Sequence, residues 1–103
     1  MASRVAQFQA LVERQPDNEL FRFSLAQALI AAAHEAEAVP HLEFCAAKKN
    51  DWMMPRILLG KTLLKLGRPA EARLMLEAAL ALAVAQRHEE PEHDLRTLLA
   101  ELH

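Results

Sequence analysis

The sequence predicts an all-α protein of stacked helical hairpins, and three observations support this prediction. First, the chain matches itself when it is shifted by 34 residues, so that Arg22 aligns with Arg56 and Leu42 with Leu76. This period is typical of a unit of two short helices. Second, 52% of the 103 residues are apolar and only two are Gly. Third, the apolar residues recur with the spacing of amphipathic helices, whose apolar faces are buried when hairpins stack.

The apolar spacing predicts about six helices. They are expected near residues 4–15, 19–33, 36–49, 53–66, 70–86 and 91–102. The first contains Phe8 and Leu11 and is followed by Pro16, which matches the second half of a preceding hairpin. The next four helices form two whole hairpins. The last helix has an apolar stripe of four leucines, which are Leu95, Leu98, Leu99 and Leu102.

These helices are expected to form one domain with four parts. The parts are an N-terminal half-repeat helix at 1–18, a first repeat at 19–52, a second repeat at 53–86 and a C-terminal capping helix at 87–103. The prolines agree with these boundaries, since Pro55, Pro69 and Pro91 fall in the first turns of expected helices, where a missing N–H costs little.

Small residues stand where two helices of a hairpin must approach each other closely. Ala26 and Gly60 are equivalent positions of the two repeats, and so are Ala38 and Ala72. A larger side chain at these positions would push the helix backbones apart. We also expect a turn at Gly67, and at Ala33, which takes its place in the first repeat.

The second repeat resembles a tetratricopeptide repeat. That family has a Leu-small pair, a Leu or aromatic residue one turn later, a turn Gly, and an Ala, a large apolar residue and an Ala along the second helix. Here these positions are Leu59, Gly60, Leu63, Gly67, Ala72, Leu76 and Ala79. The resemblance implies an all-α, right-handed superhelix of stacked antiparallel hairpins. The sequence departs from the family pattern in two ways. Arg22 and Arg56 replace a large aromatic or aliphatic residue, and Asn50 and Val84 replace the Pro that usually closes each repeat.

Sequence motifs for catalysis, metals or cofactors are not found. His88 and His93 are five residues apart with Pro91 between them, so they do not share a helix face as zinc-protease histidines do. The two Gly cannot form a phosphate-binding loop. Cys45 lies one turn after His41, but we interpret Cys45 as a buried structural thiol. We therefore expect no enzyme activity, no bound metal and no cofactor.

Charge and composition restrict the class of partner. Residues 48–73 contain seven Lys and Arg against Asp51 and Glu71, a local charge of +5, but only Trp52 is aromatic there. This pattern favours a solvated helix face over a nucleic-acid site. The uncharged stretches are too short to span a bilayer, and no export signal is present. We expect a cytoplasmic, bacterial protein with no membrane or nucleic-acid partner.

The resemblance implies that the first helix of each hairpin lines a concave groove with one of its two stripes. The expected groove residues are Leu20, Phe23, Gln27, Ile30, Met54, Ile57, Lys61 and Lys65. A groove with apolar residues beside two Lys suits a peptide segment of another protein that is partly apolar and partly acidic. The resulting hypothesis is a non-enzymatic adaptor or scaffold. The alternative is a self-association module, a homodimer, whose groove is filled by its own C-terminal helix or by a second copy.

Overall fold

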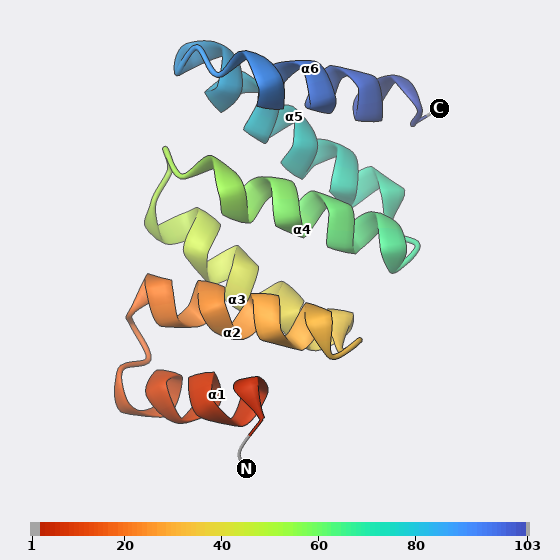
Figure 1. Cartoon of the computed structure of the whole chain (residues 1–103). Coiled ribbons are helices and arrows are strands. Elements are labelled where there is room, and N and C mark those ends of the chain that lie inside the picture. The colour runs from red at the N-terminus through yellow and green to blue at the C-terminus, as the bar shows by residue number, and fades with distance from the viewer. Residues whose placement is uncertain (1–2, 103) are drawn as a thin grey trace.

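The computed structural model describes residues 3–102, and over those residues it contains six α-helices and no strand (Figure 1). The helices are α1 (Arg4–Arg14), α2 (Glu19–Ala31), α3 (Glu35–Lys48), α4 (Met53–Lys65), α5 (Pro69–Ala85) and α6 (Glu89–Ala100). The prediction of an all-helical fold is confirmed. Residues 1–2 and 103, at the outer ends of the expected half-repeat and capping helix, lie outside the described residues.

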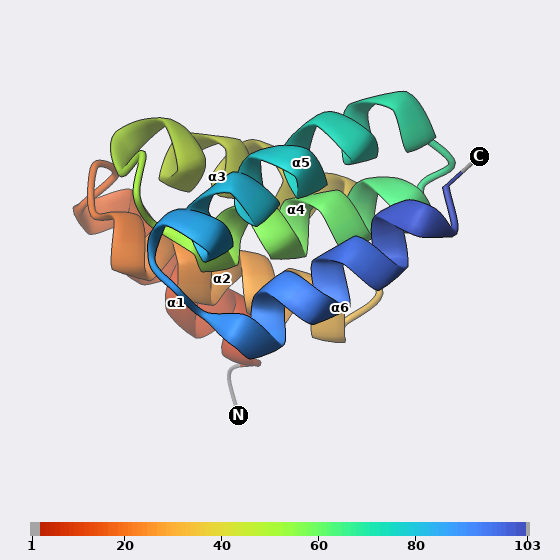
Figure 2. The ribbon, with the colours of Figure 1, turned by 90° about the horizontal axis from the view of Figure 1, so that it is seen from above.

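The helices form an elongated stack of 42 × 27 × 20 Å in which each helix packs mainly on its neighbours in the chain. Figure 1 shows α2, α4 and α6 one above another, with α3 and α5 crossing behind them. In the view from above, α3 and α5 lie along one side of the stack and α6 lies along the other (Figure 2). The stack therefore has two different broad faces, which we name the α2–α4–α6 face and the α3–α5 face.

Equivalent turns close the two hairpins. Ala33 has φ 63° and Gly67 has φ 74°, so both leave the helix in the left-handed region. In each turn the next N–H bonds back to a helix carbonyl, from His34 to Leu29 at 2.8 Å and from Arg68 to Leu63 at 2.9 Å. This pattern satisfies carbonyls that the helix end leaves free. The turn at Ala33 ends α2 at Ala31, two residues before the expected end.

The last helix begins earlier than expected. The sequence predicted a start near Pro91, whereas α6 begins at Glu89. Pro91 is the third residue of the helix, where no N–H is needed for the intrahelical ladder. Three carboxylates in the first turn, Glu89, Glu90 and Glu92, favour this start because they face the positive end of the helix dipole.

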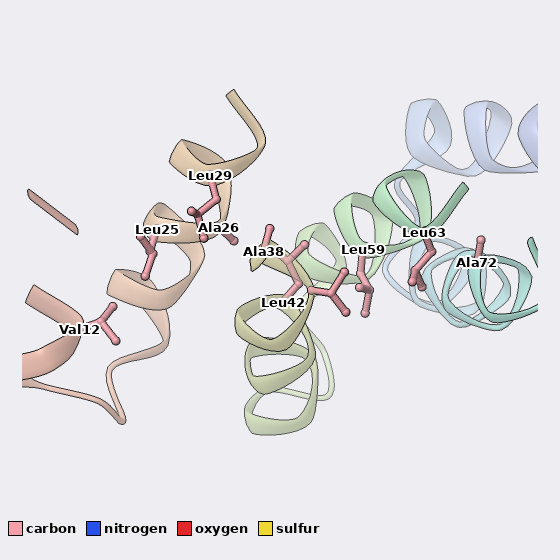
Figure 3. Packing of buried hydrophobic residues seen from close by; sticks show 10 residues of the cluster. Val12, Leu25, Ala26, Leu29, Ala38, Leu42, Leu59, Leu63 and Ala72 are labelled. Atoms are coloured by element: carbon pink, nitrogen blue, oxygen red, sulfur yellow. The ribbon is translucent and has the colours of Figure 1, made fainter. Parts of the chain in front are cut away.

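The core is one row of small and branched side chains that runs through the stack. Figure 3 shows Val12, Leu25, Ala38, Leu59 and Ala72 from successive helices along this row. A second cluster, which includes Leu76, Ala83 and Leu95, attaches α6 to α5 and α4. A single hairpin could not bury these faces, so the stack holds each helix in place.

Close helix approach depends on the small residues that the sequence singled out. Ala26, Ala38 and Ala72 are fully buried. At Gly60 an added Cβ would lie 2.6 Å from Leu76 Cγ. The helices α4 and α5 therefore have no room for a side chain at residue 60.

The two arginines that depart from the family pattern have the same role in both repeats. Arg22 Nε donates to the carbonyl of Pro16 at 2.7 Å. Arg56 Nη2 donates to the carbonyls of Ala46 and Asn50 at 3.3 and 3.5 Å. Pro16 and Asn50 each lie six residues before the arginine, in the connection from the previous hairpin. The arginine thus ties the start of each repeat to the chain that leads into it.

Candidate functional site

The expected groove residues divide between exposed and half-buried positions. Leu20 and Met54, equivalent residues at the starts of α2 and α4, are 59% and 52% exposed. Phe23 and Ile57, one turn later, are half-buried. The Phe23 ring centroid lies 4.9 Å from that of Trp52, so Phe23 packs on the connection that leads into α4. Exposed apolar side chains at repeated positions are typical of a binding surface.

A hollow between α4 and α6 brings three of the expected residues together. It has a volume of about 550 Å³, and Met54, Ile57 and Lys61 line its α4 side. The α6 side is formed by Pro91, His93, Asp94, Leu95, Thr97, Leu98 and Glu101. We name this the α4–α6 hollow. Leu20, Phe23, Gln27, Ile30 and Lys65 do not line it.

The α2 residues lie elsewhere on the surface. Gln27 is exposed, whereas Ile30 is half-buried and packs, with Phe23, against the core row. Leu20 borders a shallow depression formed with the connection of residues 15–19. The expected set of eight therefore occupies more than one depression.

Sequence reasoning missed the α6 wall because it treated residues 87–103 only as a capping helix. The helix α5 has 17 residues and its counterpart α3 has 14, so α6 begins 36 residues after α4. Counted from the helix start, Leu95 matches Leu25 and Leu59, and all three are buried. In this register Thr97 of α6 is the residue equivalent to Lys61 of α4. The carboxylates that mark the start of α6 at Glu89 were the signal that would have revealed this wall.

The two expected lysines differ in their surroundings. Lys65 Nζ lies 2.6 Å from Glu35 Oε1, so its charge already has a partner within the chain. The hydrogen bond from Lys65 lowers the pKa of the Glu35 carboxyl. The salt bridges among residues 3–102 do not include Lys61, Asp94 or Glu101. Opposite charges of the α4–α6 hollow therefore face solvent and are available to a ligand.

A second apolar hollow lies on the α3–α5 face, where sequence reasoning placed no site. It has a volume of about 370 Å³ and lies between α3, α4 and α5. Its apolar lining includes Ala46, Leu59, Leu63, Leu74 and Met75. Leu74 is 64% exposed at its edge. We name this the α3–α5 hollow.

Cys45 has the environment of a structural thiol. The side chain is buried, and Sγ donates to the Glu19 carbonyl at 3.3 Å. Burial raises the pKa of the Cys45 thiol to about 11, so the thiol stays protonated at neutral pH. Within residues 3–102 no group of three His, Cys, Asp or Glu side chains is placed to hold a metal ion. None of the helices over the same residues has the length and hydropathy needed to cross a bilayer.

Comparison with known proteins finds a sequence relative and several solved structures, among them PcrH and BPP2914. No family model matches the chain. The chain is 35% identical over 72 residues to DnaJ homolog subfamily C member 3 of Rattus norvegicus, which is 70% of this chain but 14% of the rat protein.

Both solved structures share the fold. The crystal structure of PcrH in complex with the chaperone binding region of PopD superposes with a TM-score of 0.84 and 21% identity, covering 92% of this chain and 72% of PcrH. The solution structure of protein BPP2914 from Bordetella parapertussis has a TM-score of 0.81 and 27% identity, covering 99% of this chain and 89% of that protein.

Proposed function

We propose that this chain is a protein-interaction module of the tetratricopeptide-repeat type, which holds a peptide segment of a partner on its α2–α4–α6 face. The observation that carries the proposal is the α4–α6 hollow, which combines an apolar floor with charges on its edges that form no salt bridge within residues 3–102. PcrH, which has the same fold, has been crystallised in complex with the chaperone binding region of PopD. A protein partner is therefore the class of ligand that this fold supports best.

The lining of the hollow specifies the chemistry of the bound segment. Met54 and Ile57 offer apolar contact, and such contact supplies most of the affinity in a groove of this kind. Lys61 on α4 suits an acidic residue of the segment. Asp94 on α6 and Glu101 at the C-cap of α6 suit a basic residue. The partner segment is thus apolar at its centre and carries charges of both signs, one for each wall.

The eight residues expected from the sequence remain part of this proposal. Leu20, Phe23, Gln27 and Ile30 extend the surface along α2, while Lys65 contributes less because Glu35 already pairs with it. The role of the module is that of an adaptor or scaffold without enzyme activity. A reducing bacterial cytoplasm suits its single buried thiol.

A capture experiment with matched variants tests the proposal. Wild-type protein and the variants Met54→Glu and Lys61→Glu are immobilised and exposed to the same cell extract. Both side chains are exposed, so neither change should lower the melting temperature. We expect proteins retained by the wild type to be lost from both variants. Arg4→Glu, on the exposed side of α1, is the control and should retain them.

The captured partner is then used to locate the contact. A peptide from it should shift the NMR signals of Ile57, Lys61 and Leu98 together and leave those of Glu13 unchanged. Salt should weaken binding, because the charges of the hollow are exposed to solvent. Retention of the same proteins by Met54→Glu and Lys61→Glu would contradict the proposal.

A further inference from the structure

The α3–α5 hollow has an equivalent one repeat earlier, and the two differ in a way that points to an interface. A smaller hollow of about 200 Å³ lies between α1, α2 and α3. Its floor is Leu25 and Leu29, and the floor of the α3–α5 hollow is Leu59 and Leu63, in each case 34 residues later. The same depression therefore occurs twice on this side of the stack.

Side-chain size and polarity explain why the second depression is larger. Val12 and Glu13 line the first hollow, and their equivalents in the second are Ala46 and Ala47. The volume rises from about 200 to about 370 Å³ because these two side chains become smaller. His41 of the first hollow is likewise replaced by Met75 of the second. The second hollow is both wider and less polar.

The edge of the larger hollow carries the most exposed large apolar side chain among the residues described. Leu74 lies there with 64% of its surface exposed. Its equivalent beside the first hollow is Pro40, which is exposed but shorter. An apolar side chain that projects beside an apolar hollow makes the surface complementary to itself. Self-complementarity of one patch is the property of an interface with twofold symmetry.

We infer that the α3–α5 face is a homodimer interface, in which Leu74 of each copy enters the α3–α5 hollow of the other. The charges around the hollow favour a second copy as the occupant. Arg56 and Arg68 balance Glu43 and Glu71, so two copies meet without net repulsion. The Arg68 to Glu71 pair, with contacts of 2.8 and 2.5 Å, lies at the edge of the hollow and keeps its charges matched.

This interface is separate from the surface proposed for the partner segment. The α4–α6 hollow and the α3–α5 hollow share no lining residue. Figure 2 shows α5 and α6 on opposite sides of α4. A dimer formed through the α3–α5 face therefore leaves the α4–α6 hollow open on each copy, and the two proposals can fail independently.

The mass of the intact chain in solution tests the inference. Multi-angle light scattering and sedimentation are measured from about 10 µM to about 1 mM, a range that detects weak dimers. The wild type should change from monomer to dimer over this range. Leu74→Glu places a carboxylate in the apolar hollow of the partner copy, and we expect the dissociation constant to rise by about tenfold or more.

Two further variants make the result specific. Ala47→Glu gives the second hollow the residue that the first hollow has at position 13, so the fold should tolerate it while dimerisation weakens. Ala10→Glu makes the same exchange on the exposed side of α1 and should dimerise as the wild type does. A wild type that stays monomeric up to the highest concentration would overturn the inference. The inference would also be overturned if Leu74→Glu and Ala47→Glu dimerised as strongly as the wild type, or if Ala10→Glu lost the dimer.

Discussion

The two hairpins α2–α3 and α4–α5 reach the same geometry with different residues. Where α2 meets α3 the small residue is Ala26, and where α4 meets α5 it is Gly60. The left-handed turn is made by Ala33 in the first hairpin and by Gly67 in the second. The two hairpins thus have the same backbone geometry, but equivalent residues contribute differently to the free energy of unfolding. A given substitution should therefore have different effects in the two hairpins.

The largest expected effect concerns the close approach in the second hairpin. Gly60→Leu should lower the free energy of unfolding by about 3 kcal/mol or more, because even a Cβ at residue 60 would lie 2.6 Å from Leu76. Lys61→Leu, at the exposed neighbouring position, should have little effect. Thermal and urea melts measure both. Equal stabilities would show that the assigned register of α4 is wrong.

A double-mutant cycle isolates the contact that distinguishes the hairpins. Gly60→Ala alone should destabilise the protein by about 1–3 kcal/mol because its methyl group collides with Leu76. In a Leu76→Ala background the same change should become neutral or stabilising, because the methyl group then fills space and Ala favours helix. Ala26→Gly, the reverse exchange in the first hairpin, serves as the comparison. Additive effects of Gly60→Ala and Leu76→Ala would refute this explanation.

Ala33→Gly and Gly67→Ala should change the free energy of unfolding in opposite directions. Ala33→Gly should stabilise the protein by about 1 kcal/mol, because Ala is strained at φ 63° and Gly is not. Gly67→Ala should destabilise it by a similar amount of about 1 kcal/mol through backbone strain, since no other atom lies within 4 Å of an added Cβ. Urea melts resolve differences of this size. If both variants changed the free energy of unfolding in the same direction, the two turns would not be equivalent.

The smallest effect concerns equivalent ion pairs that follow the turns. His34 pairs with Glu37 at 3.2 Å and Arg68 pairs with Glu71 at 2.5 Å. The first pair is ionic only when His34 is protonated, whereas the second is ionic whenever Glu71 is deprotonated. The hydrogen bond from Arg68 lowers the pKa of Glu71 below its ordinary value.

A lowered pKa in the folded state gives stability that is present above the unfolded pKa and is lost as the pH falls through the folded pKa. The contribution of Glu71 should therefore disappear only in acid, and it should be small because both groups are exposed. NMR titration of the Glu71 carboxyl should show the lowered pKa, and Arg68→Gln should raise it. If the pKa of Glu71 were unchanged in Arg68→Gln, Arg68 would not be the cause of the lowered pKa.

Most of the fold could be predicted because it depends on local spacing. The apolar period located all six helices within a few residues. The boundary errors have local causes. Ala33 ends α2 by turning left-handed, and the carboxylates of Glu89 and Glu90 start α6 early. Neither the left-handed turn nor the carboxylates can be inferred from the spacing of apolar residues.

The candidate surfaces were less predictable. Met54, Ile57 and Lys61 do line a hollow, but its other wall comes from α6, which the sequence indicated only as a capping helix. The pairing of Lys65 with Glu35 joins residues 30 positions apart and has no counterpart in the first hairpin. The α3–α5 hollow was missed because it results from the small size of Ala46 and Ala47, which reads in sequence as ordinary helix surface.

The sequence by itself determined the number and type of helices, the hairpin repeat and the small residues at the helix contacts, because each depends on near neighbours and on side-chain volume. Only the tertiary structure decided which exposed side chains share a hollow and which charges are already paired. Those properties depend on the rotation of each helix about its axis. That rotation is set when successive hairpins pack, as the extra length of α5 shifts the register of α6.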